Sequence, residues 1–252
     1  MATYLNQIIN KYHIAGDIDF ITHYNVISPL ESEIKEWAGY NLNKIFLSGS
    51  RAKGTAINLS SDFDLFISLN SSCSNTLKEI YLSLYDYMLQ KGYNVRKQNV
   101  SLGIEFKGHS IDLVPSKKHL GHTNYHSLYK NKTDTWTQTN VEQHIRLIKE
   151  SGRINEIILL KIWRRLHDLD FPSMYLELFV INKLKYRSTQ NIENNFWYLL
   201  GELSANFKSL QIIDPSNTNN VISNDLTESE KNKISLKAKE SRTKKSWSDI
   251  VW

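Results

Sequence analysis

The chain lacks the features that mark secreted and membrane proteins. Its 252 residues include a single cysteine, Cys73, which excludes an internal disulfide bond and is typical of a reducing compartment. No apolar run approaches the roughly 20 residues that a bilayer-spanning helix needs. The first residues also lack the basic-then-apolar pattern of a secretory leader. We therefore expect a cytoplasmic protein that does not contact a membrane.

A structural zinc site is also missing. His119, His122 and His126 fall within one short segment, but no cysteine accompanies them and their spacing matches no common zinc signature. We expect these histidines to lie on the surface or in loops. No internal repeat or low-complexity linker divides the chain. The length of 252 residues predicts one large domain or two intimate lobes with an ample core, and the 40% share of hydrophobic residues indicates a packed globule.

The charge balance is moderately basic. The formal net charge is +5, which helps to attract nucleotides or nucleic acid. This value is modest for a dedicated duplex-binding protein, and a solvated basic face explains it equally well. No specificity for DNA is therefore predicted.

The most informative stretch is residues 49–55 (GSRAKGT). The apolar run at 44–47 predicts a buried strand that ends in a tight turn at Gly49. Gly49 lets the backbone approach a ligand closely, and Ser50 adds a hydroxyl group. A turn that opens a helix offers free N–H groups to phosphate oxygens. The predicted phosphate-binding residues are Gly49, Ser50, Gly54 and Thr55.

Two carboxylates follow this turn in a second predicted strand, residues 62–69. Asp62 and Asp64 are two residues apart, so their side chains share one face of the strand, while Phe63 and Leu65 point into the core. Two like charges so close repel each other unless a cation lies between them. Oxygen ligands favour Mg²⁺ or Mn²⁺ over zinc. The alternative is that both residues simply end a strand near solvent.

A third carboxylate, Asp112, lies in a later hairpin. A turn at 107–109 separates two alternating strands, and we expect the second to close at Pro115. With Asp62 and Asp64, Asp112 completes a predicted site for two metal ions that clamp an in-line displacement at phosphorus. Asp112 is also placed to take the proton of an attacking hydroxyl group.

Helices are predicted in both halves of the chain, and the second half is predicted to be mostly helical. In the first half, Ser28 and Glu31 form a predicted capping box with Pro29 at the first helical position, which starts a helix to about residue 38. Gly92 predicts the end of another helix. Thr227 predicts a cap before the last helix, and residues 216–225 a loop. Further helices are expected near residues 140–150, 154–168, 174–187 and 191–207.

The pattern G-S-x3-G-T-x6-D-x-D, with the later Asp112, resembles the DNA polymerase β-like nucleotidyltransferase superfamily. Residues 159–164 (LLKIWR) and 172–178 (PSMYLEL) resemble helices of two of its groups. One is the bacterial cGAS/DncV-like (CD-NTase) and oligoadenylate synthetase group, and the other the archaeal-type CCA-adding enzymes. Residues 214–221 (DPSNTNNV) are similar to a segment of the first group, which is the closer of the two.

The resemblance implies an α+β fold. Its polymerase β-like core is a mixed sheet with flanking helices, and a helical second lobe adds a nucleotide cleft between the two. We expect a catalytic domain at residues 1–135 and a helical lobe at 136–252. In the resembled family the lysine that matches Lys161 reaches the triphosphate; the alternative is a lysine that extends to solvent from an apolar helix.

The implied activity is metal-dependent transfer of NMP from a nucleoside triphosphate to a ribose hydroxyl group, with release of pyrophosphate. The favoured product is a cyclic or linear oligonucleotide second messenger in antiphage defence. One alternative is nucleotide addition to RNA 3′ ends, as in CCA addition, so RNA remains a candidate acceptor or activator. Another is an inactive nucleotide-binding module, which the presence of all three acids disfavours.

Overall fold

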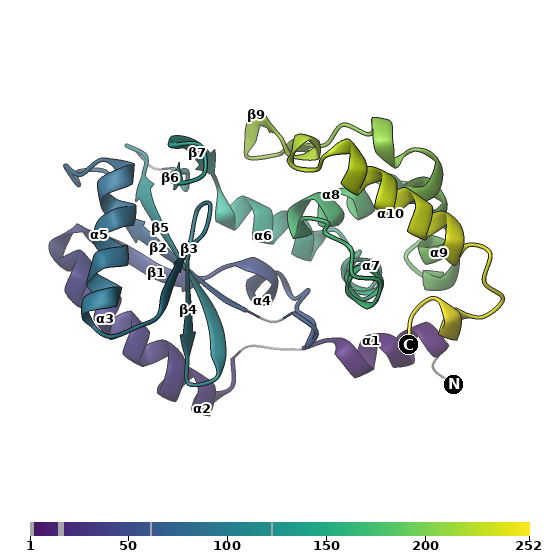
Figure 1. Ribbon diagram of the computed structural model, residues 1–252, viewed down its shortest axis with the longest axis horizontal. Helices are drawn as coiled ribbons and strands as arrows, with labels where there is room; N and C mark the ends of the chain where they lie inside the picture. Colours follow the sequence, from purple (N-terminus) through teal and green to yellow (C-terminus); the bar gives the residue numbers. More distant parts are fainter. Residues whose placement is uncertain (1–2, 15–17, 61, 122) are drawn as a thin grey trace. The chain divides into compact units, whose positions relative to one another are not determined.

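The computed structural model describes residues 3–14, 18–60, 62–121 and 123–252. These residues form two compact units, which Figure 1 draws in sequence colours. The sheet unit takes its residues from 16–53 and 61–145, and the helical unit from 1–15, 54–60 and 146–252. The division into domains 1–135 and 136–252 stays a prediction. Two short stretches from the first half of the chain, residues 1–15 and 54–60, belong to the same unit as the helices of the second half.

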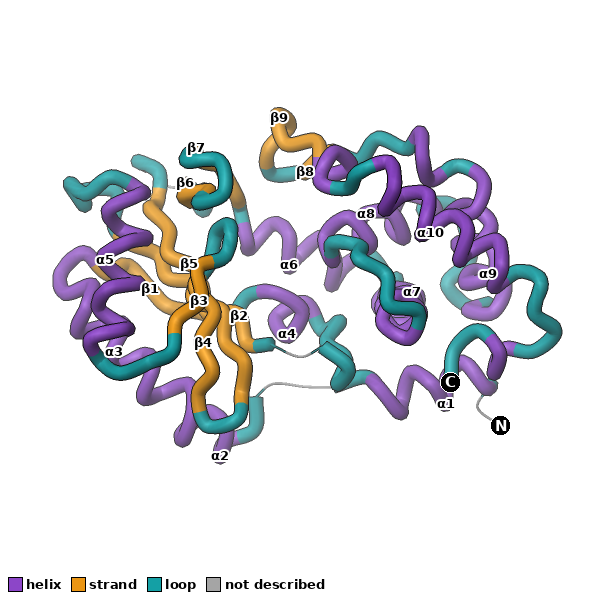
Figure 2. The backbone as a smooth tube through the Cα atoms, viewed as in Figure 1, coloured by secondary structure: helices purple, strands orange, loops and turns teal. Residues whose placement is uncertain are grey.

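The sheet unit is built on one mixed sheet (Figure 2). Its strand order is β1-β2-β5-β4-β3, and β6 pairs with both β5 and β7. The β2–β5 pair is parallel and the other pairs are antiparallel. The strands are β1 (Leu42–Leu47), β2 (Phe63–Leu69), β3 (Val95–Lys97), β4 (Leu102–Phe106), β5 (His109–Lys118), β6 (His126–Lys130) and β7 (Thr135–Thr139).

One face of this sheet packs on helices α3 (Ser28–Ala38) and α5 (Leu77–Gln90). Phe63 and Leu65 of β2 are buried in that core, as predicted. Because side chains alternate along a strand, Asp64 projects from the opposite face. The remaining helical pieces of the sheet unit are α2 (Phe20–Thr22), the π-helical segment His23–Ile27, the 3-10 turn Gly39–Asn41 and α4 (Gly49–Lys53).

Several local predictions are confirmed. Thr227 forms a capping box with Glu230 at the start of α10, and Gly92, with a φ of +86°, follows the C-cap of α5. Lys107 and Gly108 form the β4–β5 turn, with φ of 48° and 77°. A positive φ at both positions matches the right-handed twist of the two strands.

Three local predictions are wrong. Ser28 is no N-cap, because the helical chain already runs from α2 through His23–Ile27 into α3 and leaves Ser28 with helical dihedrals. β5 continues through Pro115 to Lys118, since Pro115 lies opposite Ile67 in the parallel pair without ending it. Within the expected loop 216–225, residues Asn217–Val221 form β9, which pairs with β8 (Ile213–Asp214).

The histidine segment also departs from expectation. His126 is 4% exposed and lies in β6, so the prediction of a surface or loop residue is wrong for it. Its Nδ1–H donates to the carbonyl of Asn124 at 3.0 Å, and its Nε2 accepts from the Ser68 hydroxyl at 2.8 Å. Burial lowers the pKa of His126 to about 4, which keeps the ring neutral. His122 lies outside the described residues.

The helical unit surrounds one apolar core, to which α7 contributes an almost fully buried stretch, residues 156–164. In the described part of the chain, no helix is long and apolar enough to cross a membrane. The α-helices of this unit are α1 (Tyr4–Tyr12), α7 (Ile154–Leu166), α8 (Ser173–Leu184), α9 (Ile192–Ala205) and α10 (Glu228–Ser241). It also holds strands β8 and β9 and the 3-10 segments Phe207–Ser209, Ile222–Asp225 and Trp247–Asp249. Helix α6 (Val141–Glu150) is divided between the two units, with residues up to 145 in the sheet unit.

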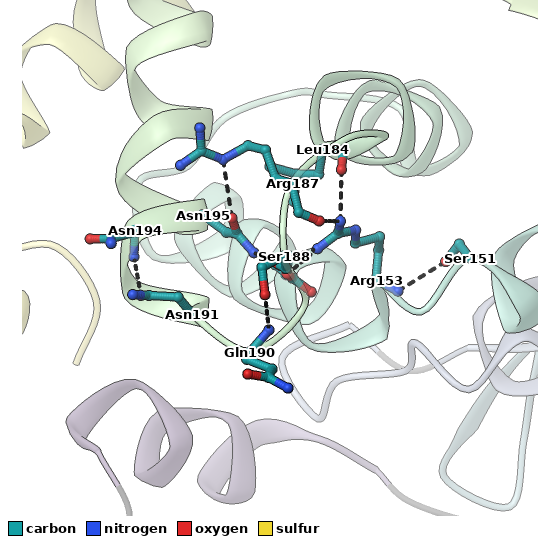
Figure 3. A network of polar contacts seen from close by, with 10 residues as sticks. Ser151, Arg153, Leu184, Arg187, Ser188, Gln190, Asn191, Asn194 and Asn195 are labelled. Carbon is teal, nitrogen blue, oxygen red and sulfur yellow. Dashed lines mark hydrogen bonds and ion pairs between the residues drawn. The ribbon is translucent and has the colours of Figure 1, made fainter.

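A buried arginine organises the end of α8 (Figure 3). Arg153, which is 5% exposed, donates to the carbonyls of Leu184, Arg187 and Ser188. Its guanidinium also pairs with Glu156 at 3.1 Å. Leu184 is the last residue of α8, and Arg187 and Ser188 follow it, so Arg153 adds a donor to carbonyls at and just beyond the end of the helix.

Candidate functional site

Two of the predicted carboxylates lie side by side in the sheet unit. Asp64 of β2 and Asp112 of β5 are register partners in the parallel pair, and both are half-buried. Asp62 is exposed and comes directly before β2. Parallel strands carry like ends to the same edge of a sheet, so the sequence spacing of Asp62 and Asp64 and the pairing of β2 with β5 bring these acids together. Sequence reasoning alone could not have given the β2–β5 pairing.

The predicted turn is fitted closely to Asp64. Gly49 opens α4 with a φ of +60°, and a Cβ atom at this position would overlap the carboxylate of Asp64. The backbone N–H of Ser48 donates to the carbonyl of Asp64 at 2.7 Å. Glycine is therefore needed twice, once for the left-handed backbone and once for the space that the carboxylate fills. Sequence analysis predicted the turn for phosphate approach and missed this contact.

Asp112 is held by a neutral partner. The side-chain amide of Gln98 donates to Asp112 Oδ1 at 2.8 Å, and Ser101 donates to the other end of that amide at 2.9 Å. Burial, and after it the negative charge of Asp62, raises the pKa of Asp112 above its ordinary value. Gln98 was missed because a lone glutamine in a loop carries no motif.

Gly103 makes room for this arrangement. It faces Asp112 from β4, and a Cβ atom there would lie 2.6 Å from the Gln98 Nε2 and 3.3 Å from the Asp112 Oδ1. Those distances are shorter than ordinary van der Waals contact. The sequence therefore places a residue without a side chain where the Gln98–Asp112 hydrogen bond needs space.

The donor chemistry of these acids fits a hard divalent cation. Asp64 and Asp112 offer carboxylate oxygens from adjacent strands. Burial, and after it the charge of Asp62, raises the pKa of Asp112, and a bound cation would favour its ionised form. Among the described residues, however, no group of three or more His, Cys, Asp or Glu side chains is arranged to hold a metal ion. The place of Asp62 in such a set, and the number of ions, stay predictions.

Ser50 follows Gly49 in α4 of the sheet unit, and the remaining predicted residues belong to the helical unit. Gly54, with a φ of +74°, leads to Thr55, which is fully buried. The ammonium of Lys161 lies 2.8 Å from the Thr55 hydroxyl and 2.7 Å from the Glu177 carboxylate. Lys161 does not extend to solvent, because only 2% of it is exposed. Its contact with a triphosphate stays a prediction.

Comparison with known proteins finds a matching family model and a related protein. The family model described as nucleotidyltransferase domain matches residues 27–159. Cyclic AMP-AMP-AMP synthase of Escherichia coli strain MS 115-1 is 24% identical over 182 residues, which are 65% of this chain and 56% of that protein. The chain thus spans little more than half the length of this curated relative.

Solved structures show the fold. CdnC of Escherichia coli MS115-1, solved with ATP, matches with a TM-score of 0.75 and 18% identity over 94% of this chain and 88% of that one. The CD-NTase CdnG of Bradyrhizobium diazoefficiens, solved in complex with GTP, matches with a TM-score of 0.70 and 10% identity over 98% and 94% of the two chains. The α+β, polymerase β-like fold expected from the sequence is confirmed.

Proposed function

Because the chain belongs to the nucleotidyltransferase domain family, whose model matches residues 27–159, we propose that it joins nucleotides into a cyclic oligonucleotide signal. The enzyme transfers NMP from a nucleoside triphosphate to the ribose hydroxyl group of a second nucleotide and releases pyrophosphate. The product class is supported by a relative named cyclic AMP-AMP-AMP synthase and by CD-NTase structures solved with ATP or GTP. A defence role against phage follows from this product class.

The observation that carries the proposal is the pairing of Asp64 with Asp112 beside the Gly49 turn. Two carboxylates from adjacent parallel strands face the same side of the sheet, and the backbone of the turn lies against one of them. Phosphoryl transfer needs little covalent chemistry from the protein and depends on positioning and charge. This corner of the sheet unit supplies both.

Asp64 and Asp112 would hold a divalent cation, Mg²⁺ or Mn²⁺, with Asp62 as a third ligand, and a second ion is proposed to bind with it. Such a cation, when bound, neutralises charge on the phosphates and on the attacking oxygen. Gly49 and Ser50 bind phosphate oxygens, and Gly54 is assigned the same role. Thr55 is fully buried, so its side chain supports the chain at this point and does not contact phosphate.

Asp112 is assigned the proton transfer. Its raised pKa makes it a better proton acceptor than an ordinary aspartate, and Gln98 fixes the orientation of its carboxylate. As the ribose hydroxyl loses its proton to Asp112, its oxygen forms a bond to the α-phosphorus. The bond from that phosphorus to the bridging oxygen breaks, and pyrophosphate leaves with the electron pair.

The proposal is tested by incubating the purified protein with the four labelled nucleoside triphosphates and Mg²⁺ or Mn²⁺, with and without bulk RNA. We expect phosphatase-resistant small products that form without RNA. They should disappear in the Asp62→Ala/Asp64→Ala variant and persist in Asp86→Asn, whose exposed carboxylate lies on α5. Label that appears only on RNA would replace the proposal with 3′-end addition. Nucleotide binding without any incorporation would favour the inactive binding module.

A further inference from the structure

Three polar side chains contact one another inside the helical unit, and we call them the buried triad: Thr55, Lys161 and Glu177. None is more than 2% exposed. Lys161 donates to the Glu177 Oε1 at 2.7 Å and to the Thr55 Oγ1 at 2.8 Å. The Thr55 hydroxyl in turn donates to the same Glu177 oxygen at 3.2 Å. The contacts join α7, α8 and the segment that follows Gly54.

Such a group is a costly way to stabilise a core. Removing a lysine and a glutamate from water carries a large desolvation penalty, and well-packed apolar side chains often serve stability as well or better. The pair therefore suggests a requirement for geometry rather than for stability. The geometry that it fixes is that of Thr55, since Lys161 also approaches the Thr55 carbonyl at 3.5 Å.

Thr55 lies close along the chain to the predicted phosphate-binding turn. Only Gly54 separates it from Lys53, the last residue of α4, and α4 begins with Gly49. Further contacts anchor the same segment to the end of α1: His13 Nε2 meets the Gly54 carbonyl at 3.1 Å, and the Ile14 N–H donates to Ala56 at 3.0 Å. The residues on either side of Thr55 are thus held through their backbone carbonyls, whereas the triad holds the Thr55 side chain and carbonyl.

We propose that Glu177 is a positioning residue for nucleotidyl transfer. By binding both Lys161 and Thr55, it fixes the Gly54–Thr55 part of the phosphate-binding turn. This inference rests on the proposed function, because it concerns the same turn. It also changes the expected role of Lys161, whose charge is compensated inside the protein and which acts through Thr55.

The test uses Glu177→Gln, which keeps the shape of the side chain and removes its charge. Two readouts are followed: hydrogen exchange of the amides at 55–58 in the native protein, and the kcat and KM of pyrophosphate release. We expect faster exchange and a kcat lower by roughly 10–100-fold, since a misplacement of about 1 Å can reduce a rate about 100-fold. The KM for nucleotide should change much less.

The matched control is Glu202→Gln, which removes the Lys183–Glu202 ion pair (2.7 Å) between α8 and α9. It should leave exchange at 55–58 and kcat unchanged. If Glu177→Gln does not fold, the Lys161→Met/Glu177→Leu variant replaces the pair by apolar side chains and is expected to fold. It should show the same loosening of 55–58 and the same loss of kcat.

Wild-type exchange and wild-type kcat in either folded variant would overturn the inference. An unchanged kcat with a raised KM in the double variant would also overturn it and return Lys161 to the role of direct phosphate ligand. Failure of the proposed function looks different. The wild-type protein would then release no pyrophosphate, while exchange at 55–58 would still report whether the triad fixes Thr55.

Discussion

Glu156 and Glu177 of the helical unit are held differently from Asp112 of the sheet unit. In the helical unit, Glu156 and Glu177 each accept from a cation, Arg153 at 3.1 Å and Lys161 at 2.7 Å. In the sheet unit, Asp112 accepts from the neutral amide of Gln98 and lies within the field of a second carboxylate. Its pKa is raised, so its ionised form is less favoured than in water.

This difference separates scaffold from reaction site. A carboxylate that is paired inside the protein has its charge satisfied before any ligand arrives, and its loss damages the fold. Asp112, by contrast, has a neutral donor and a raised pKa, so a bound cation would stabilise its ionised form, and its loss should damage the chemistry instead. Removal of Glu156 or Glu177 is therefore expected to lower stability, whereas removal of Asp112 is expected to lower activity.

Asp112→Asn gives the largest expected effect. We expect pyrophosphate release to fall roughly a thousandfold or more, because both a metal ligand and the proton acceptor are lost. In metal-free buffer, the free energy of unfolding should stay the same or rise, because the repulsion with Asp62 is removed. Steady-state kinetics and urea unfolding measure the two quantities. A marked loss of stability with retained activity would assign Asp112 to the scaffold.

Arg153→Met should show the reverse pattern. It leaves Glu156 buried without its cation and deprives the carbonyls of Leu184, Arg187 and Ser188 of a donor. We expect the free energy of unfolding to fall by about 3 kcal/mol, while kcat below the melting temperature changes little. The Arg153→Met/Glu156→Met variant should recover part of the stability, because no unpaired charge remains. Urea unfolding without such recovery would show that the carbonyl contacts, not the ion pair, carry the effect.

His126 is a buried titratable group that stays neutral, in contrast to the carboxylates that are paired with a cation or with a neutral amide. Its folded pKa is about 4, below the ordinary 6.5, so the unfolded chain binds the proton first as pH falls. The stabilisation is complete above about pH 6.5 and is lost between pH 6.5 and pH 4. Between pH 7 and pH 5 we expect a loss of about 2 kcal/mol.

The measurement for His126 is urea unfolding of the wild-type protein and of His126→Gln at both pH values. The wild type should lose more stability than the variant on acidification, since glutamine does not titrate. Equal losses would mean that other groups, such as His167, whose pKa burial also lowers, carry the acid sensitivity.

Sequence patterns predicted those features of the fold that depend on local chemistry. The capping box at Thr227 and the turn at 107–108 follow from residues within a few positions of each other, and both are present. The Ser28 prediction failed for the opposite reason: a helix start is visible only if the preceding residues are not helical, and here they are. Local rules are overridden where the neighbouring chain continues an element.

The candidate site also has features that the sequence predicted and features that it could not predict. The D-x-D spacing and the glycine turn were visible in the sequence, because they depend on short separations. The contact of Gly49 with Asp64 and the hydrogen bond from Gln98 to Asp112 depend on how strands pair, so no sequence signal could have shown them. Glu177 stood within the resembled motif, but its partnership with Thr55 joins residues 122 positions apart.

The smallest expected difference is between two glycines that share a backbone conformation and differ in their surroundings. Gly49 and Gly92 both have positive φ, but a Cβ atom would overlap the Asp64 carboxylate at Gly49 and meet nothing within 4 Å at Gly92. Alanine at either site should lower the free energy of unfolding by about 1–2 kcal/mol through the backbone alone. The collision should add about 1 kcal/mol at Gly49, within the usual range for a local steric conflict.

Only Gly49→Ala should also reduce pyrophosphate release, because relief of the collision moves the Asp64 carboxylate. Urea unfolding and steady-state kinetics of the two alanine variants therefore test whether this corner of the sheet unit is shaped for chemistry. Equal stabilities and equal activities would mean that Asp64 moves aside without consequence. The close fit of the turn to the carboxylate would then no longer distinguish the reaction site from the scaffold.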